Sequence, residues 1–179
     1  MIYIKSDKEI ELMRKPCEIV RDVLCLCEEK IRAGMTTKEL DKIAYDYITS
    51  CGATPSFLGY GGFPAATCIS IDEQVVHGFP SDRIIEEDQI VSVDVGAFFN
   101  GFHGDAARSL YVGHISPEKK KLIDVTRECF FEGIKGICIG SALGDIGAQV
   151  QEHAEKNGFS VVRDMVGHGV GRHLHEDPS

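Results

Sequence analysis

The sequence lacks the features that mark membrane, secreted and nucleic-acid-binding proteins. No apolar run approaches the roughly 18 residues of a membrane-spanning helix, and the N-terminus MIYIKSDKEIELM has no apolar core of a signal peptide. There is no basic run, and the formal net charge is −9, which disfavours nucleic acid and anionic membrane as partners. We therefore expect a cytoplasmic protein, with a small or peptidic ligand as its partner.

Cysteine pairs of the CxxC type are also missing. The seven cysteines are odd in number and lie mostly within apolar patterns, which favours reduced core thiols over disulfides or a zinc knuckle. They are Cys17, Cys25, Cys27, Cys51, Cys68, Cys129 and Cys138. The length of 179 residues and the ordinary apolar and charged fractions predict one globular domain, residues 1–179.

The segment QIVSVDVGAFFNGFHGDAARSLYV (89–112) is what the sequence does contain in clear form. Two β-branched, apolar runs meet at Asn100-Gly101, the dipeptide that most favours a two-residue hairpin turn. An even-length turn would put Asp94 and Asp105 on one face, opposite or diagonal, with Cβ atoms roughly 5–8 Å apart. Such carboxylates repel unless a cation lies between them, which predicts a metal site. Alternatively, one Asp faces solvent and the other caps a turn, and a three-residue turn would reverse the parity.

The first half of the chain contains two helix signals of the capping-box type. Ser6 with Glu9 opens a helical pattern that reaches Ile31, in which Pro16 is expected to kink the helix or split off its first turns. Thr36 with Glu39 opens a second helix, which ends at Cys51-Gly52.

The segments that follow predict a long loop and short strands. Residues 53–66 are rich in Gly, Pro and aromatic residues and predict an ordered, functional loop. Residues 68–71 predict a strand, and 75–80 a short strand that leads from His77 into a turn. After position 115 the pattern predicts two more helices and then a strand at 160–166.

An internal repeat relates the two halves at an offset of 106. Residues 34–52 align with 140–158, matching Gly34 to Gly140 and Gly52 to Gly158. The alternative is that any two capped amphipathic helices align this well. The repeat predicts an α+β fold with pseudo-two-fold organisation and an incomplete second half, because the first copy continues much further than the second.

Histidines supply the remaining candidate ligands. His168 lies among glycines in GHGVG (167–171), where its ring stays uncovered, and His77 and His175 could each donate to, or take a proton from, a reacting carbonyl or water. Carboxylates with an imidazole suit Mn(II), Fe(II), Co(II) or Zn(II), and bridging carboxylates favour two ions roughly 3.5–4 Å apart. The other histidines are interpreted as surface or turn residues.

The segments VDVGAFFNGFHGDAARSLYVG, CISIDEQVVHGFP and MVGHGVGRHLH closely resemble the type I methionine aminopeptidases, and the resemblance runs over the whole chain. It implies the pita-bread (creatinase/aminopeptidase-like) fold and the metal-dependent removal of N-terminal methionine from peptides and nascent chains. Separately from the resemblance, we expect a monomer. Two divalent ions, Co, Mn, Fe or Zn, would serve the complete enzyme.

The resemblance also implies roles for individual residues. It makes Asp94, Asp105 and His168 metal ligands, with Asp105 bridging, and it makes His77 and His175 the catalytic and substrate-contacting histidines. The positions that match the lining of the methionine pocket are Tyr60, Phe63 and Cys68, and Phe57 stands where some members have a smaller residue.

One departure from the family concerns two further glutamate ligands, which members carry on strands beyond the segment that matches His175. This chain has three of the five ligands, so we expect it to bind one metal ion weakly and to be marginally stable. The alternatives are a non-catalytic pita-bread binding module or inactive truncated form, and a prolidase-type peptidase of the same fold.

Overall fold

The hairpin of strands β3 (Ile90–Phe99) and β4 (Phe102–Tyr111) is the centre of the fold in the computed structural model, which describes residues 1–179. The turn has two residues, Asn100 (φ 49°) and Gly101 (φ 86°), both in the left-handed region that a type I′ turn requires. The strands pair without a bulge from Ile90 opposite Tyr111 to Phe99 opposite Phe102. The predicted hairpin and its even-length turn are therefore confirmed.

Two further strands complete an antiparallel four-stranded sheet. β1 (Thr54–Pro55) and β2 (Thr67–Ile71) pair with opposite ends of β3, while β4 pairs with its other edge. The predicted strand at 68–71 is thus present. Residues 75–76 form no strand, because the backbone there turns away after one hydrogen bond from Ile69 N–H to the Gly78 carbonyl (2.9 Å).

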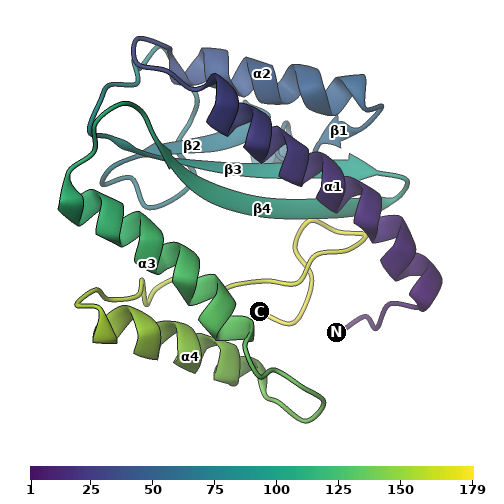
Figure 1. Ribbon diagram of the computed structural model, residues 1–179. Coiled ribbons are helices and arrows are strands. Elements are labelled where there is room, and N and C mark those ends of the chain that lie inside the picture. Colours follow the sequence, from purple (N-terminus) through teal and green to yellow (C-terminus); the bar gives the residue numbers. More distant parts are fainter. The chain divides into compact units, whose positions relative to one another are not determined.

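Helices α1 (Asp7–Lys30) and α2 (Thr37–Ser50) cover one face of this sheet (Figure 1). Both predicted capping boxes are formed, by Ser6 with Glu9 and by Thr36 with Glu39. The helices bury their apolar sides against alternate residues of β3. The largest side chains of this core include Ile19, Val20, Leu40, Ile48, Ile69, Ile71, Ile85, Val91, Val93 and Val95.

Pro16 does not divide α1, which runs without interruption from Asp7 to Lys30. The expectation that its first turns would split off is therefore wrong. Pro16 is buried, and a Cβ atom at Gly104 of β4 would lie 2.6 Å from its carbonyl carbon. The helix and the strand touch through their backbones here, and this packing holds the helix together through the proline.

The chain divides into two compact units, one of residues 1–115, 168–177 and 179, the other chiefly of residues 116–167. The second unit contains α3 (Pro117–Ile134) and α4 (Leu143–Lys156), both as predicted. Its small core consists of Val125, Cys129 and Ala154, flanked by Val150, Phe159 and Val161.

The repeat appears in the structure as two helices with matching ends. α2 and α4 both contain 14 residues and are displaced by the predicted offset of 106 positions. Gly52 and Gly158 both have positive φ, and the following N–H groups, of Ala53 and Phe159, return to the carbonyls of Ile48 and Ala154 at 3.2 and 3.0 Å.

Two expectations about other segments fail. Residues 160–166 form no strand, because no neighbouring strand offers them the ladder of hydrogen bonds that defines one. Cys17, Cys25 and Cys138 are exposed rather than part of the core, since they lie on the outer sides of their segments.

None of the helices combines the length and the apolar character that a membrane-spanning segment requires.

Candidate metal centre

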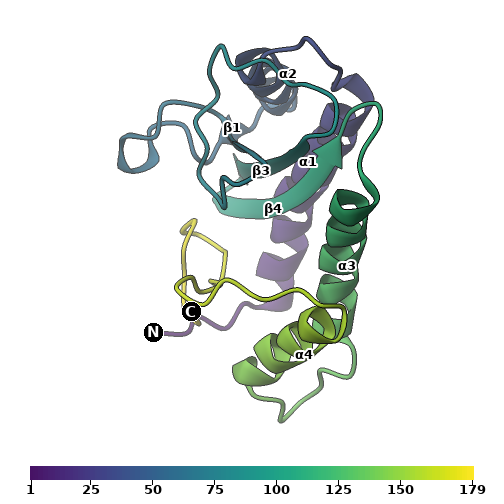
Figure 2. The ribbon, with the colours of Figure 1, turned by 90° about the vertical axis from the view of Figure 1, so that its left-hand side faces the viewer.

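The two aspartates of the hairpin lie on the sheet face opposite α1 and α2. Asp94 pairs with Ala107 and Asp105 pairs with Gly96, so the aspartates are diagonal neighbours across β3 and β4. Their neighbours Val93 and Val95 point into the helix-covered core and are fully buried. The alternation of the strand therefore turns the carboxylates towards the segment that returns at residues 168–177, which lies at the other face of the sheet (Figures 1 and 2).

The carboxyl groups are close enough to share a proton. Burial, the charge of Asp105 and a hydrogen bond with Asp105 raise the pKa of Asp94 to about 7. Burial also raises the pKa of Asp105, although the nearby His168 and the hydrogen bond with Asp94 oppose this rise. Two partly buried carboxylates in contact need a proton or a cation between them, which is the environment that suits a divalent ion.

His168 completes this group from the returning segment. Its Nδ1 donates to the Gly169 carbonyl at 2.9 Å, and its Nε2 lies 3.7 Å from Asp105 Oδ2. Because a carbonyl can only accept, Nδ1 carries a proton, and Nε2 is the ring nitrogen that faces Asp105, which is the arrangement of metal-binding histidines. The side chains do not form a closed metal-binding cluster of three. Asp105 instead contacts each of the other two, and their chemistry fits a hard or borderline divalent ion.

His175 stands beside His168, with ring centroids 4.2 Å apart. Its Nδ1 is 2.9 Å from the Tyr60 hydroxyl, which comes from the short 3₁₀ turn η1 (Tyr60–Gly62). Burial and the charge of His168 lower the pKa of His175. The Tyr60 hydroxyl thus holds the ring through Nδ1, and the lowered pKa favours the neutral imidazole.

His77 is held in a backbone conformation that few residues adopt. Its φ is 58°, its side chain is exposed, and its charge influences His175. The next residue, Gly78, packs so closely on β2 that a Cβ atom would lie 2.2 Å from the Ile69 carbonyl oxygen. Strain of this kind concentrates at functional sites, and here it presents the imidazole to solvent.

An apolar cluster adjoins the carboxylates. Cys68 pairs directly with Asp94 across β2 and β3, and it packs with Phe57, Leu174 and Phe63. Burial and the charge of Asp94 raise the pKa of the Cys68 thiol to about 12, so that it remains neutral.

Gly96 makes room for the aromatic part of this cluster. A Cβ atom there would lie 2.7 Å from the Phe57 ring. Sequence reasoning had singled out Phe57, Phe63 and Cys68 but missed Leu174, whose position between His173 and His175 was the available signal.

An open pocket of about 320 Å³ lies next to the histidines. His168 and His175 line it together with Glu176, and Met1 and Tyr3 lie at its edge. No sequence pattern predicts the N-terminal segment here, because 167 positions separate Met1 from His168.

The model of metallopeptidase family M24 matches residues 11–179. A methionine aminopeptidase of Clostridium perfringens is 53% identical over 99% of this chain and 72% of its own length. The crystal structure of methionine aminopeptidase from Thermotoga maritima superposes with a TM-score of 0.97 at 44% identity, covering 99% of this chain and 72% of that one. Prolidase from Pyrococcus furiosus is more distant, with a TM-score of 0.85 and 26% identity over 98% of this chain and 51% of its own. These similarities confirm the α+β, pita-bread fold.

Proposed function

Because the chain belongs to metallopeptidase family M24, we propose that it removes N-terminal methionine from peptides and nascent proteins in a metal-dependent hydrolysis. The observation that carries this proposal is the contact of Asp105 with both Asp94 and His168, directly beside the apolar cluster at Cys68. We further propose that residues 1–179 belong to one catalytic domain, which works as a cytoplasmic monomer.

Asp94, Asp105 and His168 are the residues that would hold the metal, with Asp105 as the bridge if two ions bind. Co(II), Mn(II), Fe(II) and Zn(II) all suit this donor set. When bound, such an ion polarises a carbonyl oxygen and makes water a stronger nucleophile near neutral pH.

The apolar cluster would receive the methionine side chain. Its aromatic rings, Phe57 and Phe63, meet edge to face with centroids 6.4 Å apart, and they offer the thioether sulfur contacts of the kind it favours. Because Cys68 lies opposite Asp94, a methionine side chain bound at this cluster would bring its scissile carbonyl near the carboxylates. Tyr60 would lie at the mouth of this pocket.

The two catalytic histidines would act on the peptide from either side of the carbonyl. Tyr60 holds His175 through Nδ1, which leaves Nε2 as the nitrogen that would hydrogen-bond the oxygen that gains charge. His77, exposed and held by Gly78, can contact the amide of the scissile bond. Removing one such donor costs about 2–4 kcal/mol of transition-state stabilisation.

A prolidase-type activity is the second candidate, favoured by the structural similarity to the Pyrococcus furiosus enzyme. Its lower identity of 26%, against 53% for the methionine aminopeptidase of Clostridium perfringens, makes it the weaker one.

The test is a peptide assay on chelator-treated chain to which Co(II) or Mn(II) is restored. We expect release of methionine from Met-Ala-Ser, no cleavage of an Xaa-Pro dipeptide, and loss of activity in Asp105→Asn. Binding of a methionine-like inhibitor, measured in parallel, reports the pocket independently of turnover. Cleavage of the Xaa-Pro peptide alone would favour the prolidase, and metal binding without any hydrolysis or inhibitor binding would favour a non-catalytic module.

A further inference from the structure

The loop that carries His168 and His175 is closed at its base by Glu176. The Gly169 N–H donates to the Glu176 carbonyl at 2.7 Å, and the Glu176 N–H donates back to the Gly169 carbonyl at 2.9 Å. Glu176 directly follows one histidine, and its partner Gly169 directly follows the other. The same residue therefore sets the spacing of both rings.

The side chain of Glu176 lies inside this loop, only 3% exposed. Its carboxylate accepts from the His173 N–H at 3.1 Å, and a Cβ atom at Gly171 would lie 2.6 Å from it. The loop is thus wrapped around a carboxylate. A buried carboxylate is costly unless a cation and several donors satisfy it.

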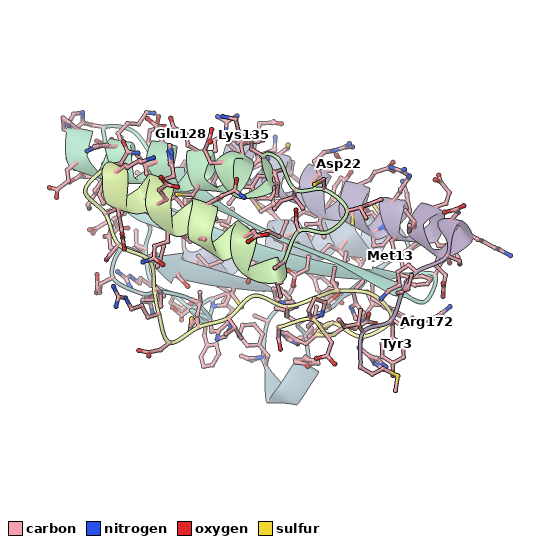
Figure 3. All side chains as sticks on the ribbon, turned by 90° about the horizontal axis from the view of Figure 1, so that it is seen from below. Tyr3, Met13, Asp22, Glu128, Lys135 and Arg172 are labelled. Atoms are coloured by element: carbon pink, nitrogen blue, oxygen red, sulfur yellow. The ribbon has the colours of Figure 1, made fainter.

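Lys5 supplies the cation from the segment before α1. Its Nζ lies 2.5 Å from Glu176 Oε2 and also donates to the Tyr3 carbonyl at 3.0 Å, and its side chain is 17% exposed. The two segments lie side by side and together line a pocket; Tyr3 and Arg172, one from each segment, are labelled in Figure 3. The N-terminal segment is in this way fastened to the loop that carries the histidines.

We infer that Glu176, held by Lys5, is a positioning residue that keeps His168 and His175 in place for metal and substrate. The inference rests on the proposed function, because it takes His168 to be a metal ligand. If Lys5 is lost, the carboxylate has no buried cation and must turn out to water, which opens the loop. If the carboxylate is lost, the His173 N–H loses its acceptor and the Lys5 ammonium keeps only the Tyr3 carbonyl, with the same result.

The chain offers a control in another ion pair, which joins the same loop to the first turn of α1. Arg172 Nη2 lies 2.9 Å from Glu9 Oε1, with side chains 59% and 27% exposed, and it does not enter the loop. Breaking this pair removes a tether between the segments and leaves the interior of the loop unchanged.

The experiment is a titration of the full chain with Co(II). Binding is measured by calorimetry and by the visible absorption of the bound ion. We expect Glu176→Gln and Lys5→Met each to weaken Co(II) binding ~10-fold or more, as loss of groups that orient metal ligands does. The double variant should be no weaker than the poorer single one, and Lys5→Arg should restore binding. Arg172→Met should stay within about twofold of wild type, because exposed ion pairs contribute little.

Two readouts separate positioning from general stability. The Co(II) spectrum at saturating metal should change in Glu176→Gln, whereas a loss of folded protein would lower only the amplitude. Equal Co(II) affinity and spectrum in wild type, Glu176→Gln and Lys5→Met would overturn the inference. If Glu176→Gln fails to fold, Lys5→Met against Lys5→Arg decides the question. Absence of Co(II) binding in wild type, in contrast, would overturn the proposed function and the inference with it.

Discussion

The two helix pairs of this chain end in the same way and differ in what they pack against. α1 and α2 share one core with the sheet, and Leu40 and Ile48 of α2 are completely buried in it. α3 and α4 bury three residues against each other and leave large apolar side chains exposed. These include Phe130, Phe131, Ile134 and Leu143. Matching helix ends therefore do not by themselves provide a deep core, which in the first pair comes from packing against the sheet.

The largest effect should come from removing equivalent side chains in the two pairs. Leu40 and Ile146 occupy matching positions of the repeat, the first fully buried and the second partly exposed. Leu40→Ala should reduce the free energy of unfolding by about 2–5 kcal/mol, because it leaves a cavity in a closed core. Ile146→Ala should cost about 1 kcal/mol, since its surroundings can relax and water already reaches it.

Denaturant unfolding with hydrogen exchange as a local probe measures both variants. Exchange should accelerate throughout the sheet in Leu40→Ala, and only in α3 and α4 in Ile146→Ala. Equal losses in the two variants would show that the second pair is as tightly packed as the first, and the comparison would fail.

Metal binding should stabilise one unit and not the other. Asp94, Asp105 and His168 all belong to the unit that contains the sheet. At a free metal concentration 100 times the Kd, that unit should gain about 2.7 kcal/mol of stability by mass action on the native state. Asp105→Asn should abolish this gain, while Asp145→Asn in α4 should keep it.

Residue-resolved hydrogen exchange with and without Co(II) tests this expectation. We expect Co(II) to slow exchange in β3, β4 and the loop after His168. The exchange rates in α4 should not change. Protection that survives in Asp105→Asn would show that this carboxylate does not bind the metal.

How far the sequence predicted the structure follows from the range of each interaction. The hairpin was predictable, because Asn100-Gly101 and the alternation on either side act over neighbouring residues. Parity then predicted that Asp94 and Asp105 share a face, opposite or diagonal, and the register of the hairpin makes them diagonal. The continuity of α1 through Pro16 was not predictable, because it depends on the packing of Gly104, 88 positions away.

The candidate site shows the same division. His168 could be proposed from its glycine neighbours, and its approach to Asp105 became visible only in the fold. Leu174 and the pair of Lys5 with Glu176 were missed, because single charged or apolar residues carry no local signal of a distant partner. The strand expected at 160–166 failed for the related reason that β-branched residues form a strand only beside another strand.

A smaller effect on the free energy of unfolding should come from removing the N-cap hydroxyl of α2 and from adding one to α4. The Thr36 hydroxyl accepts from the Glu39 N–H at 3.2 Å, whereas Ala142 at the matching position has only the return bond from its N–H to Asp145 (2.8 Å). Thr36→Ala should cost ~1 kcal/mol, and Ala142→Thr should gain ~0.5–1 kcal/mol by supplying the missing half of the box. Chemical unfolding curves measure both changes. A loss of stability in Ala142→Thr would mean that the two helix starts are not equivalent.

The smallest effect should be a local response of the first helix pair to acid. Hydrogen bonds from the Ser6 N–H and hydroxyl, followed by those of Arg172, lower the pKa of Glu9 from its ordinary value of 4.5 to about 2. A lowered folded-state pKa means that these bonds contribute fully above about pH 4.5 and are lost as the pH falls towards 2. Amide exchange at the first turn of α1 should therefore accelerate over that interval, while Glu9→Gln should show no such midpoint.

A carbon-detected NMR titration of the Glu9 carboxyl gives the midpoint directly. Arg172→Met should raise it only in part, since both Ser6 bonds remain, and a midpoint near 4.5 in wild type would show that the box is not formed in solution.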